Sequence, residues 1–75
     1  MTNWKEIDDT IALRLLNEIF ENIAHEGIFL RENSSALEKR YGKTIGTITD
    51  LIFYEDIKSS EEILAKLKTD TRIML

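Results

Sequence analysis

The sequence predicts an all-α fold, a small bundle of three or four helices around a single core. The chain has no proline and only three glycines among its 75 residues, so few positions interrupt a helix. Leu, Ile, Glu and Lys are abundant, and apolar residues recur at helical spacing in several segments. A chain of this length supports one compact core at most, so residues 1–75 are expected to form one domain.

The first helix is predicted over residues 9–26. Its apolar stripe follows helical spacing and comprises Ile11, Ala12, Leu15, Leu16, Ile19, Phe20 and Ile23. Asp8 or Asp9 can cap the start, and Thr10 is a weaker cap. Gly27 is a natural terminator because glycine readily adopts the left-handed conformation that ends many helices.

The second helix is predicted to start at Ser35. Ser35 and Glu38 have the spacing of a capping box, in which the hydroxyl and the carboxylate each satisfy a free amide of the first turn. Leu37 and Tyr41 would then face the core, and Gly42 would end the helix.

Residues 44–54 give conflicting signals. Their many β-branched residues favour a strand, but the apolar positions match helical spacing instead, namely Ile45, Ile48, Leu51 and Ile52. A third helix or a helical turn is therefore favoured. Gly46 would weaken such a helix by roughly 1 kcal/mol relative to alanine.

The last helix is predicted to start after Ser59, which forms a second capping box with Glu62. Its buried face would consist of Ile63, Leu64 and Leu67. Outside the helices, Trp4 and Ile7 are expected to fold back onto the core. The last residues either pack through Ile73 and Leu75 or fray.

The formal net charge of −4 disfavours binding to nucleic acid, which requires an excess of Lys and Arg. It favours a basic protein partner, because opposite fields speed encounter. Cysteine is absent, so disulfides and thiolate metal sites are excluded. No secretory signal is visible, and the longest apolar run, residues 51–54, is too short to span a bilayer. A cytoplasmic location is expected, with no membrane contact.

Little in the sequence indicates catalysis. The single histidine, His25, has no nucleophile arranged beside it and suits the end of a helix, where a cation complements the dipole. The paired carboxylates at residues 8–9 and 61–62 fall at helix starts, where acidic residues are expected anyway. We therefore expect no enzymatic activity, no catalytic residue, no metal site and no cofactor.

Residues 50–56, called the anchor segment below, offer the clearest candidate for function. Asp50, Glu55 and Asp56 bracket the adjacent aromatics Phe53 and Tyr54. Aromatic side chains often supply much of the energy of a protein interface. The other interpretation is that these aromatics simply pack in the core, as most apolar runs do.

A second interpretation is a DNA-binding helix-turn-helix over residues 34–53. The chain's one local basic cluster, Lys39, Arg40 and Lys43, would lie where such a motif contacts phosphates. An accessory protein without a separable activity also remains open.

The anchor segment, followed by a Ser-started apolar helix that carries Lys near its end, resembles the second half of the colicin and pyocin nuclease immunity proteins. That family has an Asp-Leu-Ile-Tyr-Tyr element on a short third helix. Asp9-Thr10, shortly before Leu15 and Leu16, is similar to the start of the family's first helix.

The resemblance implies a compact four-helix fold that binds and silences a bacterial nuclease toxin. In that family the paired aromatics are binding anchors, and an acidic second helix sets partner specificity. Carried over by position, Asp50, Phe53 and Tyr54 would form the anchor, with Glu55 and Asp56 on its acidic rim. The expected partner is a basic protein, and the small core leaves self-association open.

Overall fold

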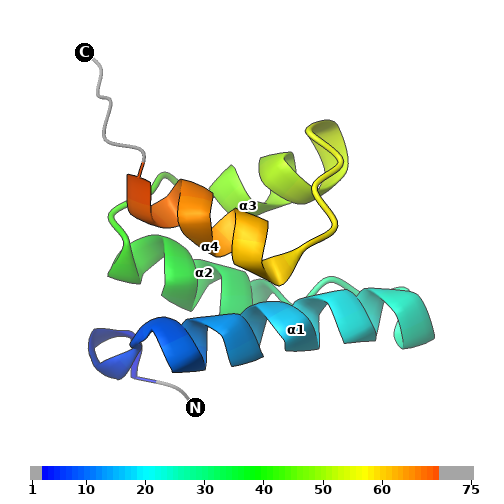
Figure 1. Cartoon of the computed structure of the whole chain (residues 1–75). Helices are drawn as coiled ribbons and strands as arrows, with labels where there is room; N and C mark the ends of the chain where they lie inside the picture. The colour runs from blue at the N-terminus through cyan, green and yellow to red at the C-terminus, as the bar shows by residue number, and fades with distance from the viewer. Residues whose placement is uncertain (1–2, 70–75) are drawn as a thin grey trace.

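The all-α prediction is confirmed by a computed structural model that describes residues 3–69. Within these residues the elements are all helical (Figure 1). In chain order they are η1 (Trp4–Glu6), α1 (Asp9–Glu26), α2 (Arg31–Arg40), α3 (Thr47–Thr49), η2 (Asp50–Tyr54) and α4 (Ser60–Thr69).

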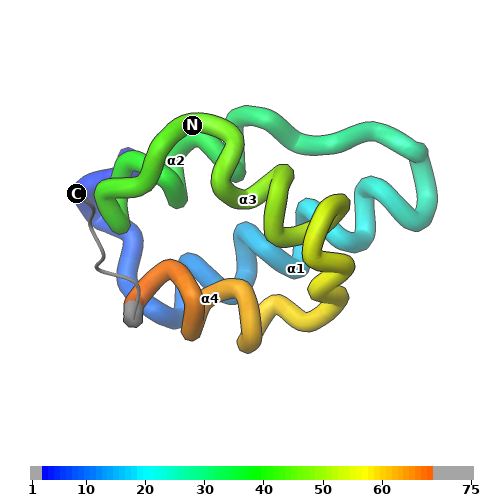
Figure 2. Tube along the Cα trace, turned by 90° about the horizontal axis from the view of Figure 1, so that it is seen from above, coloured from blue at the N-terminus to red at the C-terminus, as the bar shows by residue number. Residues whose placement is uncertain are grey.

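The longest helix, α1, is the base of the bundle. Both α2 and α4 pack against it, and η1 packs against α2. The short α3 follows α2 and runs directly into η2, which lies at the end of the molecule away from η1 (Figures 1 and 2). None of the helices in the described part of the chain is long and apolar enough to cross a membrane.

One apolar cluster joins all the major helices. Its members are less than a tenth exposed and come from α1, α2, α3, η2, α4 and the loops before α1 and α4. They are Ile7, Ala12, Leu15, Leu16, Ile19, Leu37, Ile48, Leu51, Ile52, Ile57, Ile63, Leu64 and Leu67. The single predicted core is therefore confirmed.

The predicted bounds of the first helix are confirmed. Asp8 is its N-cap, because its carboxylate accepts a hydrogen bond from the Ile11 amide at 2.9 Å. Gly27 ends the helix with a φ of 70°, a conformation that costs a glycine little. Ile7 is buried, as expected, but Trp4 is not: its side chain is 36% exposed, and the Lys5 ammonium lies 5.8 Å from the centre of its ring.

The predicted start of the second helix was wrong. This helix begins at Arg31, and Ser35 lies inside it without a capping role. The early start is stabilised from outside the helix, because the Asn33 amide group donates to the Leu15 carbonyl and to the Glu18 carboxylate at 3.1 and 3.0 Å. These bonds tie the first turn of α2 to α1, and the helix has no side-chain cap.

Residues 44–54 are helical as favoured, but only from Thr47, and the turns widen after α3. Gly46 does not weaken this helix as predicted, because it precedes the first turn with a φ of 99°. In α4 the hydroxyl of Ser59 accepts from the Glu62 amide at 3.3 Å, as the capping pattern predicts. The alternatives for Ile73 and Leu75 concern positions outside the described residues.

Candidate functional site

The anchor segment is built on η2, which has wider turns than an α-helix. The Glu55 amide donates to the Asp50 carbonyl, five residues back, at 3.0 Å, and the Ile57 amide donates to the Leu51 carbonyl at 3.1 Å. Turns of this type are rare and are often found at functional sites. Leu51 and Ile52 from the same turn are buried in the core, so they fix η2 to the bundle.

The two aromatics of the anchor segment are on the surface. The side chain of Phe53 is 56% exposed and that of Tyr54 is 85% exposed. The core-packing interpretation of these two residues is therefore wrong, whereas it holds for their neighbours Leu51 and Ile52. Large exposed apolar side chains that gather in one place typically mark an interaction surface.

Phe53 does not stand alone, because Phe29 lies beside it. The two rings meet edge to face, with centroids 5.9 Å apart and planes at 61°. Phe29 belongs to the connector between α1 and α2, which runs alongside α3 and η2 (Figure 2). A groove lined by Phe29, Ile45 and Phe53, together with parts of α2 and α3, opens between these segments.

Sequence reasoning missed Phe29 and Ile45 as parts of this surface. Phe29 is distant from Phe53 in the chain, and no local pattern links the two. Ile45 matched the helical spacing of a core residue, but it precedes α3 and is 86% exposed. The only available signal was the unusual density of apolar residues at 28–30 and 51–54.

The acidic residues of the anchor segment are exposed too. In the part of the chain that the structure describes, no side chain pairs with the carboxylates of Asp50 or Glu55. Asp56 forms an ion pair with Lys58 at 2.6 Å, and its backbone turns the chain with a φ of 59°. The five predicted residues, two with rings and three with carboxylates, are thus all exposed, and they lie on η2 or in the turn directly after it.

Glu38 fixes the start of α3, the helix that leads into the anchor segment. Its side chain is 2% exposed, and its Oε2 atom accepts from the amides of Gly46 and Ile48 at 3.1 and 3.0 Å. Two free amides at the start of α3 are thereby satisfied by a carboxylate from α2, and the negative charge complements the helix dipole. Glu38 is therefore a positioning residue for α3 and η2.

The three basic residues of the DNA-binding interpretation have different surroundings. Lys39 is exposed and lies at the edge of a groove beside Trp4. Arg40 donates from Nε to the Ile7 carbonyl at 2.8 Å, and its guanidinium lies 5.6 Å from the centre of the Tyr41 ring. Lys43 is half-buried. Arg40 is thus engaged in holding the loop before α1 against α2.

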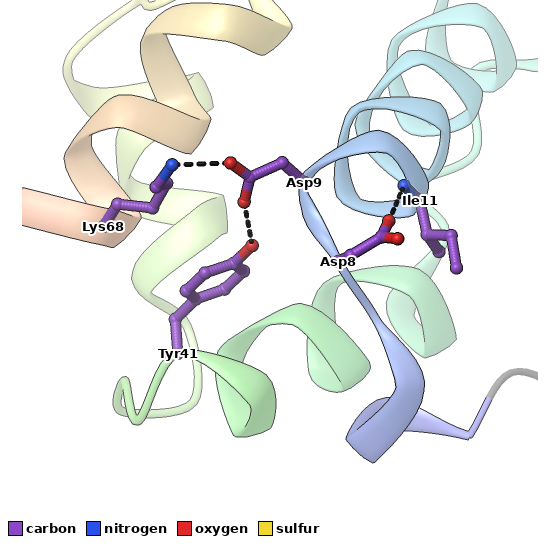
Figure 3. Close-up of polar contacts among 5 residues, drawn as sticks. All are labelled: Asp8, Asp9, Ile11, Tyr41 and Lys68. Carbon is purple, nitrogen blue, oxygen red and sulfur yellow. Dashed lines mark hydrogen bonds and ion pairs between the residues drawn. The ribbon is translucent and has the colours of Figure 1, made fainter.

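A separate polar cluster ties the ends of three helices together (Figure 3). The Asp9 carboxylate receives Lys68 Nζ at 2.6 Å and the Tyr41 hydroxyl at 3.4 Å. The hydrogen bond and charge of Lys68 lower the pKa of Asp9, and the same contact raises the pKa of Lys68. Burial, followed by the charge of Asp9, raises the pKa of Tyr41.

Within residues 3–69, few side chains are candidates for catalysis or metal binding. Between residues 3 and 69, no three His, Cys, Asp or Glu side chains come close enough to hold a metal ion. His25 is exposed in the last turn of α1.

Comparison with family models, with curated proteins and with solved structures finds no match for this chain. A proposal for the function of this chain therefore depends on the arrangement of the residues described above. Of these, the anchor segment combines exposure, aromatic surface and charge in one place.

Proposed function

We propose that this chain is a protein-binding module that contacts a basic partner through its anchor segment. The observation that carries the proposal is that η2 buries two of its apolar residues and exposes the next two. Leu51 and Ile52 are buried, while the adjacent Phe53 and Tyr54 are 56% and 85% exposed. Phe53 keeps one contact with the Phe29 ring, but Tyr54 is almost fully exposed, and aromatic surface left in water is better explained by a binding role.

The same arrangement favours tight binding. Because η2 is fixed by two core residues and by the Glu38 contacts to α3, the rings are presented on a preformed surface. A rigid surface loses little conformational entropy when it binds. The carboxylates of Asp50 and Glu55 add a negative rim that would attract a basic partner and orient its approach.

The more specific proposal is that the partner is a bacterial nuclease toxin, which this chain neutralises in the cytoplasm. It is supported by the resemblance to colicin and pyocin immunity proteins, by the short third helix and by the exposed aromatic pair at the expected positions. Nucleases that bind phosphates carry basic surfaces, and an acidic inhibitor complements them.

Several features of that family are absent, including the first of its paired tyrosines, where this chain has Phe53. The family's second helix is acidic and sets specificity, whereas α2 carries three basic residues, Arg31, Lys39 and Arg40, against two acidic ones. One of those two, Glu38, is buried. Specificity would then depend on the anchor segment itself rather than on α2.

The test is inhibition of a panel of purified colicin and pyocin nuclease domains by this protein. We expect stoichiometric loss of activity for at least one nuclease, with an association rate that falls as salt is added. Glu55→Lys should slow association about tenfold or more, whereas Glu6→Lys should change it little. Glu6 is exposed on η1, at the opposite end of the molecule, and gives the same change in net charge. A panel with no inhibition and no binding would contradict the neutralising function.

The DNA-binding alternative is less well supported by the same contacts. Arg40 is engaged with the Ile7 carbonyl, and the helix that would enter the groove of DNA carries an exposed carboxylate, Asp50. A carboxylate at that place repels phosphates. Binding to random duplex DNA at low salt that is lost on reversing the charges of Lys39 and Lys43 would favour this alternative over the protein-binding module.

A further inference from the structure

The groove beside Phe53 has an apolar surface made of three side chains. It lies between the connector after α1 and the start of α3 and has a volume of about 540 Å³, within the usual range for binding pockets. Phe29, Ile45 and Phe53 supply the apolar surface, and the planes of the two rings meet at 61°. A ligand gains free energy by covering these side chains, so its body should be apolar.

The accessible charge in the lining of this groove is positive. Arg31, at the start of α2, lines the groove and is exposed, and within residues 3–69 no carboxylate pairs with its guanidinium. The other charged residue of the lining, Glu38, is 2% exposed, and its Oε2 atom already accepts from two amides. Asp50 and Glu55 do not belong to the lining. Charge complementarity therefore selects an anion.

Two hydroxyl groups add to the polar lining. Ser35 and Thr49 are half-buried in the groove wall, and in the described part of the chain neither hydroxyl has a hydrogen-bond partner. Hydroxyls can donate, and a guanidinium can only donate, so a ligand that brings acceptor oxygens suits this lining. A carboxylate meets the requirement, because its two oxygens match two parallel N–H groups of an arginine.

The other grooves of the described residues select no ligand in this way. In the groove beside Trp4, the exposed side chains of Glu32 and Lys39 place both signs of charge in the lining. The groove along the end of α1 is lined by three glutamates and His25 and has little apolar surface to hold a ligand.

We propose that the groove formed by Phe29, Ile45 and Phe53 binds a small carboxylate with an apolar body. The apolar body covers the two rings and Ile45, and the carboxylate accepts hydrogen bonds from the guanidinium of Arg31. The inference goes beyond the proposed function and does not depend on it, because no protein partner takes part. A failed test of this site leaves the neutralising function standing, and a nuclease panel without inhibition leaves this site standing.

The test uses the full-length ¹⁵N-labelled protein and 3-phenylpropionate, titrated at constant pH and ionic strength and followed by NMR. Binding should shift the amide signals of Phe29, Thr49 and Phe53. It should also shift the Nε–H signal of Arg31. Removing the charge, in 3-phenylpropanamide, should weaken binding about fivefold, and removing the apolar body, in acetate, should abolish binding. Equal binding of the acid and the amide would overturn the inference, as would the absence of shifts at the groove with millimolar ligand.

A matched pair of variants tests the role of Arg31. Arg31→Gln should weaken binding of 3-phenylpropionate about fivefold and leave binding of the amide unchanged, because only the charge pair is lost. Arg14→Gln makes the same change in net charge at an exposed position of α1 outside the groove lining, and it should change neither affinity. Equal affinity of the two variants for 3-phenylpropionate would rule out the pairing with Arg31 and, with it, the choice of a carboxylate.

A second pair tests where the apolar body lies. Ile45→Ser removes apolar surface from the groove and should weaken the acid and the amide by the same factor. Ile28→Ser, at an exposed residue outside the groove lining, should weaken neither. Both side chains are more than half exposed, so both variants should fold. Equal binding by these two variants would contradict the placement of the ligand in this groove.

Discussion

Among single residues, Glu38 shows how a correct local pattern can point to the wrong partner. Its spacing from Ser35 predicts a capping box, yet its carboxylate reaches across to the entrance of α3. The pattern identifies a carboxylate suited to free helix amides. It carries no information on which of two nearby helix starts offers them, because that depends on how α2 and α3 pack.

We expect Glu38→Ala to destabilise the protein by about 1–3 kcal/mol, because two amides at the start of α3 lose their acceptor in a buried place. Glu38→Gln keeps one acceptor oxygen and should cost less. Urea unfolding measures the loss, and NMR shifts at Gly46 and Ile48 locate it. Glu32→Ala, an exposed change on the same helix, is the control. Equal stability of Glu38→Ala and the control would show that the carboxylate does not hold α3.

At the scale of elements, α1 and α4 were predictable and the segment between α2 and α4 was not. Both predictable helices have a regular apolar stripe and a side-chain cap, at Asp8 and Ser59. The widened turns of η2 have no residue signature, because hydrogen bonds between residues five apart can be made by any backbone. In residues 44–54 the spacing of apolar residues therefore favoured a helix over a strand, but it predicted neither the start at Thr47 nor the widened turns.

Replacing Gly46 with Ala tests whether this residue lies inside a helix or in a left-handed turn before it, because the two cases predict opposite changes in stability. If a glycine lies inside a helix, its replacement with Ala stabilises the folded protein by roughly 1 kcal/mol. With its φ of 99°, Gly46→Ala should instead destabilise by about 1–2 kcal/mol, through backbone strain alone, since an added Cβ meets nothing within 4 Å. Thermal unfolding of Gly46→Ala and of the exposed control Thr44→Ala distinguishes them. A rise in stability for Gly46→Ala would contradict the left-handed turn.

For the whole molecule, composition and periodicity predicted the fold class and most of the core, because burial of apolar stripes dominates the packing of a small helical chain. The local pattern of aromatic and acidic residues also singled out the anchor segment as a candidate site, which stays a prediction. Exposure could not be predicted, since it depends on how η2 orients Phe53 and Tyr54 relative to the core that buries Leu51 and Ile52. The contact of Phe29 with Phe53 likewise exists only after the chain has folded.

The Asp9–Lys68 pair joins α1 to α4 and makes stability depend on pH. The folded pKa of Asp9 is lowered, so its contribution is present above the unfolded value of 3.8 and is lost as pH falls through the folded pKa. The folded pKa of Lys68 is raised, so its contribution is lost as pH rises through that value. Lys68→Met should be less stable than the unmodified protein at neutral pH, and the difference should vanish in acid. Urea unfolding across pH measures this, and a difference that persists in acid would contradict it.

The central claim is that Tyr54 anchors a protein partner, and its most direct test is the substitution Tyr54→Ala. The variant is measured for unfolding in urea and for binding to a nuclease that the unmodified protein neutralises. Because the side chain is 85% exposed, we expect the free energy of unfolding to change by less than about 0.5 kcal/mol. Binding should weaken about 30-fold or more, as for a central aromatic anchor. Leu51→Ala, which empties a core position in the same turn, should instead lose about 2–5 kcal/mol of stability. A comparable stability loss in Tyr54→Ala, with binding unchanged, would contradict the account.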